Sequence, residues 1–125
     1  MKEKTSTSVD HAVIVILCLS GLRFLSCKKI REVFWTLSND EHFKNILSDL
    51  DFDCRNGQYY SPKLEKILLM FGTAGILHHS NPRYSDYYVP EESIKFAEKI
   101  LTSRSATDQR LLNRASLVFK QLMKE

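Results

Sequence analysis

Apolar residues along this chain recur mainly three and four positions apart, which is the spacing of residues on one side of an α-helix. This pattern predicts helices over residues 10–20, 27–37, 41–50, 62–73 and 90–103, and a last helix from residue 105 onward. The first of them is apolar nearly all round, which is typical of a helix at the centre of a protein core. The chain is therefore expected to fold mainly as helices around that segment.

Short polar residues stand where these helices are expected to begin. The candidate caps are Ser8 or Asp10, Ser26, Ser61 and Ser105. Each can accept a hydrogen bond from a backbone amide of the first helical turn. Ser61 has the strongest local pattern, because Pro62 follows it at the first helical position, where a missing amide costs nothing. Gly21 and Gly75 are expected to end their helices in the left-handed conformation.

Two segments have the composition of β-strands instead. Residues 76–79 and 83–89 are rich in Tyr and Ile and are joined by the turn sequence Ser80-Asn81-Pro82. They predict a hairpin, which must pack on the helices to be stable. Before them, residues 51–55 alternate polar and apolar side chains and lead into Asn56-Gly57. We expect an extended edge segment there, followed by a tight turn.

The predicted fold class is therefore mainly α with a small β-hairpin, an α+β arrangement. Helix, helix, helix, strand, loop, strand is the order of a winged helix-turn-helix, in which residues 62–73 form the third helix. At 125 residues, the chain is long enough for one core. We expect a flexible N-terminal arm over residues 1–9, a winged-helix domain over 10–103 and an additional C-terminal interaction helix over 104–125.

The segment before the third helix extends this interpretation. Its Tyr60-Ser61 resembles the Gly-Pro-Tyr-Ser segment that leads into the third helix of the YwgA-like winged-helix family, and Gln58-Tyr59 stands where that family has Gly-Pro. Gly75-Ile76-Leu77 is similar to the start of the family's hairpin, and residues 87–92 and 28–30 fit the same layout. The resemblance covers roughly residues 10–101. It implies a winged helix that binds DNA or a partner protein, in transcriptional regulation or a toxin-antitoxin system, rather than an enzyme.

Basic residues are distributed around the expected third helix, although the net charge is only +3, from 18 Lys and Arg against 15 Asp and Glu. In a DNA-binding winged helix, the outward side of that helix lies in the major groove and the wing contacts the DNA backbone. The basic residues that could gather on that side are Lys28, Lys29, Arg31, Arg55, Lys63, Lys66 and Arg83. They predict salt-dependent contacts to the phosphates of double-stranded DNA.

The outward side of the third helix also carries Leu69 and Met70. Exposed apolar side chains of this kind are poor readers of DNA bases but good contacts for another protein. The second and third helices are also separated by far more residues than in a tight helix-turn-helix. Two functions therefore stay open: a DNA-binding regulator or antitoxin-like protein, and a winged-helix protein-protein interaction module that does not read DNA.

The last helix has a narrow apolar seam. The seam consists of Leu111, Ala115, Val118 and Leu122, and Leu112 and Phe119 flank it. The four and three spacing is that of a coiled coil, but the seam is too short for the helix to be stable alone. We predict that it pairs with a second copy to form a homodimer. Docking on its own domain is the alternative.

Composition and motifs argue against several other classes of protein. The chain is 43% hydrophobic and 26% charged, as globular proteins are. The apolar run over residues 12–25 is too short for a membrane span, so no membrane partner is expected. The three cysteines have no paired spacing, which argues against a disulfide framework and against a zinc site. We therefore expect a reducing, cytoplasmic location. His78 and His79 alternate along a strand and so do not suit one metal ion. We expect no cofactor, no metal, no catalytic residue and no enzyme.

Overall fold

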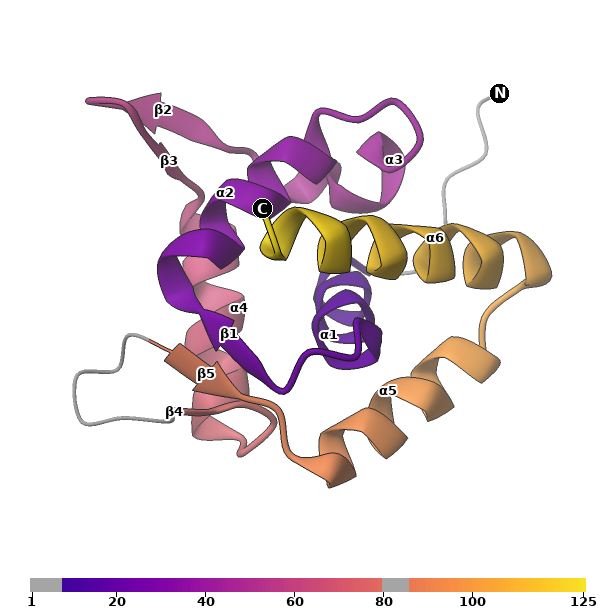
Figure 1. Cartoon of the computed structure of the whole chain (residues 1–125). Coiled ribbons are helices and arrows are strands. Elements are labelled where there is room, and N and C mark those ends of the chain that lie inside the picture. The colour runs from indigo at the N-terminus through magenta and orange to yellow at the C-terminus, as the bar shows by residue number, and fades with distance from the viewer. Residues whose placement is uncertain (1–7, 80–85) are drawn as a thin grey trace.

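The computed structural model describes residues 8–79 and 86–125, which are mostly helical with a small antiparallel sheet (Figure 1). In chain order the elements are α1 (Val9–Leu19), β1 (Phe24–Ser26), α2 (Cys27–Ser38), α3 (Lys44–Leu47), the 3₁₀ helix η1 (Ser48–Leu50), β2 (Asp53–Arg55), β3 (Gln58–Tyr60), α4 (Pro62–Thr73), β4 (His78–His79), β5 (Asp86–Tyr88), α5 (Glu91–Thr102) and α6 (Ala106–Met123). The predicted α+β class is confirmed.

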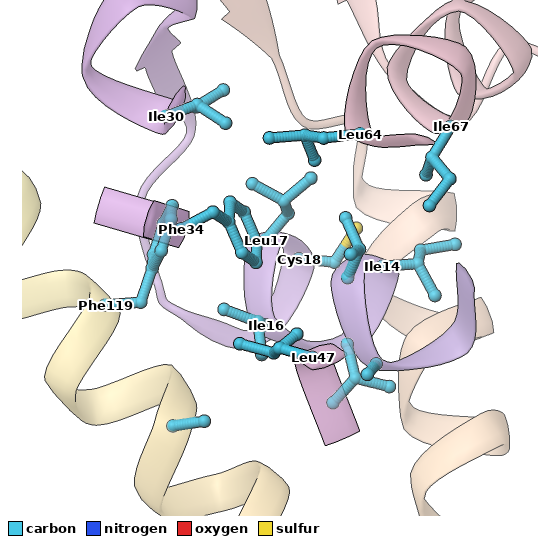
Figure 2. Close-up of a cluster of buried hydrophobic side chains, with 14 of the residues drawn as sticks. Ile14, Ile16, Leu17, Cys18, Ile30, Phe34, Leu47, Leu64, Ile67 and Phe119 are labelled. Atoms are coloured by element: carbon cyan, nitrogen blue, oxygen red, sulfur yellow. The ribbon is translucent and has the colours of Figure 1, made fainter. Parts of the chain in front are cut away.

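Helix α1 lies at the centre of the molecule (Figure 1), as its all-round apolar pattern predicts. All of its eleven residues are buried or half-buried. Helices α5 and α6 pack against it, and so do α3 and η1. Figure 2 shows Ile14, Ile16 and Leu17 of α1 among side chains contributed by α2, α3, α4 and α6. One continuous core therefore joins segments from the whole described length of the chain.

Strand β1 joins the hairpin strands in one sheet, whose order is β1-β5-β4. The sequence predicted β4 and β5 as a hairpin but not β1, because three residues between two helices are too few for a recognisable alternation. Phe24 pairs with Tyr88, and Leu25 pairs with Tyr87. Since neighbouring residues of a strand point to opposite sides, Leu25 is fully buried whereas Phe24 is 66% exposed. The predicted start of the second strand, at Arg83, lies outside the described residues.

A second hairpin, β2–β3, lies between α2 and α4 in sequence and projects from the helical body (Figure 1). Its two-residue turn is Asn56-Gly57, with φ of 53° and 76°. Positive φ at both positions is required by the turn that best matches the twist of a hairpin, and Asn-Gly suits it. The ring of Tyr59 stacks on Trp35 of α2, with 3.9 Å between centroids. The sequence predicted the turn and the first strand; the second strand and its anchor were missed.

The helix ends follow the predicted chemistry. Ser8, Ser26, Ser61 and Ser105 each cap a helix by accepting a backbone amide, and Gly21 and Gly75 have positive φ just beyond α1 and α4. The predicted helix over 41–50 was too long. The regular α-helix is only Lys44–Leu47 and is followed by the 3₁₀ turn Ser48–Leu50, while residues 41–43 form a turn in which the carboxylate of Asp40 accepts the amide of His42 at 2.8 Å. That hydrogen bond also lowers the pKa of Asp40.

Helix α6 uses its apolar seam inside the chain. Ala115 and Phe119 are fully buried against the core, and the ring of Phe119 lies 5.4 Å from that of Phe34 on α2. Leu111, Val118 and Leu122 are partly buried against the same core. The prediction that this seam forms an intermolecular contact is therefore wrong for Ala115 and Phe119, and docking on the domain is what the structure contains. The homodimer itself stays a prediction.

We expect Phe119→Ala to lower the free energy of unfolding by about 3–5 kcal/mol, because it leaves a cavity in the core. Leu117→Ala, on the same helix but at a position that is 66% exposed, should change it by no more than about 0.5 kcal/mol. Urea unfolding followed by circular dichroism measures both. Equal effects of the two substitutions would mean that α6 is not part of the cooperative unit.

Candidate functional site

Helix α4 packs on the core through its apolar stripe, and Ser61 fixes its start. Leu64, Ile67, Leu68 and Phe71 are all buried, as predicted. The hydroxyl of Ser61 accepts the amide of Leu64 and donates to the carbonyl of Leu50, which joins the beginning of α4 to η1. Because this one hydroxyl is bonded both to η1 and to the first turn of α4, it fixes the position of the start of α4 relative to η1.

The outward side of α4 changes character along its length. Lys63 and Lys66 are exposed in the first half, where they are neighbours on the helix surface. In the second half, Leu69 is 71% exposed and Met70 47% exposed. The structure therefore places these four predicted site residues on one accessible surface, basic at the amino end and apolar at the carboxyl end.

An ion pair joins α2 to α4. The guanidinium of Arg31 donates two hydrogen bonds to the carboxylate of Glu65, at 2.8 and 2.9 Å. These hydrogen bonds are the main cause of the raised pKa of Arg31. A bidentate pair of this kind fixes orientation as well as contributing energy. Arg31, predicted as a phosphate contact, is thus engaged inside the chain, and Glu65 is neutralised between Lys63 and Lys66.

Cys27 and Tyr87 lie beside this pair. Burial raises the pKa of the Cys27 thiol, and the positive charge of Arg31 only partly opposes that change. Burial likewise raises the pKa of Tyr87 to about 12. Both groups are therefore neutral near pH 7. A thiol in its protonated form is a weak nucleophile, so Cys27 is not activated by the neighbouring Arg31.

The two hairpins meet opposite ends of α4 (Figure 1). A hollow of about 450 Å³ lies at the carboxyl end, where Leu69 and Thr73 of α4 meet His79 and Tyr87 of the sheet. A second hollow of about 460 Å³ lies at the amino end, where Glu65 and Arg31 meet the β2–β3 hairpin. The accessible surface of α4 is consequently bordered by a depression at each end.

The remaining basic candidates do not all reach this surface. Lys28 is exposed at the start of α2 and lines a hollow together with Arg31 and the tip of the β2–β3 hairpin. Lys29 donates to the carbonyl of Glu125 and lies 3.9 Å from Glu32, so it is bonded within the chain. Arg55 is in β2, and its side chain lies outside what the structure describes. Arg83 is also outside the described residues.

Two polar residues of the hairpin were missed as site candidates. Asn56 and Gln58 line both hollows that border the hairpin, together with Tyr59. The Asn-Gly turn indicated a hairpin tip, but the residues after it are equally typical of a lead into the helix. Only the pairing of β2 with β3 shows that these amides project beside α2 and α4.

Comparisons with models of protein families, with curated proteins and with solved structures returned no match. Among residues 8–79 and 86–125, no three His, Cys, Asp or Glu side chains are grouped so that they could hold a metal ion. Within the same residues, no helix combines the length and the apolar character needed to cross a membrane.

A double-mutant cycle of Arg31→Ala and Glu65→Ala is expected to give a coupling free energy of about 1 kcal/mol, because the pair is bidentate but still partly exposed to solvent. Urea unfolding of the four proteins measures it, and the coupling should fall at high salt. The matched control is Lys29 with Glu32, 3.9 Å apart on one helix, for which about 0.3 kcal/mol is expected. Couplings of equal size would contradict a special role of the α2–α4 pair.

Proposed function

We propose that this chain is a cytoplasmic DNA-binding protein of the winged-helix type, acting as a transcriptional regulator or an antitoxin-like protein. The observation that carries the proposal is the arrangement of α4 and the strands that follow it. Strands β4 and β5 come directly after α4 and form one sheet with β1, which lies between α1 and α2. With α1, α2 and α4 as the three helices, this is the order of a winged helix, and α3 with the β2–β3 hairpin is an insertion between the second and third helices.

The charge on α4 supports contact with the DNA backbone. Lys63 and Lys66 are exposed, and the carboxylate between them in sequence is neutralised by Arg31. Lysine is a compact point charge that binds phosphate, and a contact to phosphate carries no sequence information. Helix α4 has 12 residues and is therefore about 18 Å long, roughly half a helical turn of B-DNA. Lys63 and Lys66 both lie in its first half, so they can contact neighbouring phosphates of one stretch of the backbone.

A second function is favoured by the carboxyl half of α4. Leu69 and Met70 are the exposed apolar side chains of this helix, and Leu69 lines the hollow between α4 and the sheet. An apolar rim around a depression is the kind of surface that a partner protein covers. A winged helix that contacts another protein through this half is therefore the alternative to a DNA-binding regulator.

Lys63→Ala combined with Lys66→Ala is expected to weaken binding to every duplex and to reduce the slope of log affinity against log salt by about 2, roughly 1 for each lysine. Gel-shift titration of promoter and genomic fragments at several salt concentrations measures both effects. Lys95→Ala with Lys99→Ala removes the same charge from the exposed side of α5 and should leave binding close to that of the wild type. Failure of the wild type to bind duplex DNA at low salt would exclude the proposal.

The alternative makes a different expectation. If the apolar half of α4 binds a protein, Leu69→Glu with Met70→Glu should abolish recovery of a defined partner in an affinity purification, whereas the double lysine variant should retain it. Leu117→Glu is the matched control, because this leucine on α6 is 66% exposed. Loss of the partner with Leu117→Glu as well would point to general instability, which thermal unfolding of each variant checks.

A further inference from the structure

The hairpin β2–β3 is built as a rigid projection. Its tight turn uses Asn56 and Gly57, both with positive φ, so the tip has one well-defined backbone conformation. At its base, Tyr59 stacks flat on Trp35, with 13° between the ring planes. Tyr60 leads directly into Ser61, whose hydroxyl is bonded to η1 and to α4. The hairpin is therefore held by α2 on one side and by α4 on the other.

The accessible side of this projection is polar and hydrogen-bonding. Gln58 is exposed and Tyr60 is 42% exposed, and the two share the side of β3 opposite Tyr59, because successive strand residues alternate. Asn56 is exposed at the tip. Primary amides present a donor and an acceptor together, which is the combination that pairs with the major-groove edge of adenine. Lys63 and Lys66 on α4 have no such combination.

The charge near the hairpin is mixed and includes cations that can contact phosphates. From Asp53 to Leu64 the sequence contains one carboxylate, Asp53 of β2, and two cations, Arg55 and Lys63. Lys28 and Glu32 of α2 both line the hollow beside Asn56 and Gln58, which has a volume of about 580 Å³. Lys28 and Lys63 are exposed, so each can contact a phosphate that flanks a base edge.

We infer that the β2–β3 hairpin enters the major groove of duplex DNA and reads base edges through Asn56 and Gln58, while Lys28 and Lys63 contact the flanking phosphates. A two-stranded ribbon fits the major groove as an α-helix does. This inference rests on the proposed function. It assigns sequence reading to the inserted hairpin and leaves α4 the task of positioning the protein on the backbone.

The experiment is selection of binding sites from random duplex DNA, followed by competition titration of the selected duplex against a shuffled one. The test variant is Asn56→Gly with Gln58→Val. Glycine keeps the positive φ and valine keeps the strand, so the fold is preserved while both amides are removed. We expect the preference of this variant for the selected duplex to fall by roughly 5- to 150-fold for each base that the hairpin no longer reads. Binding to the shuffled duplex should stay nearly unchanged.

Two controls separate the possible failures. Asn45→Ala with Asn113→Ala removes two exposed amides from α3 and α6 and should leave the preference intact. Lys63→Ala with Lys66→Ala should weaken binding to the selected and the shuffled duplex by the same factor, and should leave the selected sequence the same. An unchanged preference in the hairpin variant, or a wild type that binds duplexes without preference, overturns the inference while leaving DNA binding in place. A wild type that binds no duplex overturns both.

Discussion

Helix α1 has an apolar surface on every side, and burial of that surface is the constraint on which the other elements depend. A helix of this kind cannot leave one side exposed to solvent, so other elements must pack around its whole circumference. Helices α5 and α6, with α3 and η1, supply part of that enclosure, and the close-up of the core shows α2 and α4 supplying more (Figure 2). The docking of α6 follows directly, because Ala115 and Phe119 fill space that would otherwise expose α1 to water.

The same enclosure explains how α4 can be both fixed and accessible. Its apolar stripe faces the core, and Arg31 and Ser61 hold its flank and its beginning, so the outward side needs no packing partner for stability. The relative orientation of α2 and α4 is fixed by the Arg31–Glu65 ion pair and by the Ser61 cap at the start of α4. The chain between the two helices is consequently available to form α3 and a projecting hairpin.

Much of this fold could be predicted from the sequence, for reasons that are local. Serine caps, left-handed glycines and the stripe of α4 depend on neighbours a few positions away, and each was confirmed. The features that were missed depend on distant residues. Strand β1 is defined by its pairing with β5, and the hairpin is stabilised by Trp35, which lies far earlier in the chain than Tyr59.

The candidate site shows the same division. The exposure of Lys63, Lys66, Leu69 and Met70 followed from helical spacing alone. The ion pair between Arg31 and Glu65 could not be predicted, because nothing in either local sequence indicates that α2 and α4 approach each other there. The burial of Ala115 and Phe119 was missed for a related reason. A short apolar seam is equally suited to a second copy and to the chain's own core, and only the position of α1 decides between them.

The order in which the chain is synthesised gives α1 a further property. Its apolar surface is completed only when α5 and α6 are available, and these are the last helices of the described chain to be made. At typical rates of about 5–20 residues per second, α1 waits on the order of ten seconds for the partner that begins at Ala106. During that interval the exposed apolar segment is open to chaperone binding and to aggregation. Folding of this domain during translation is therefore expected to be late and concerted rather than progressive.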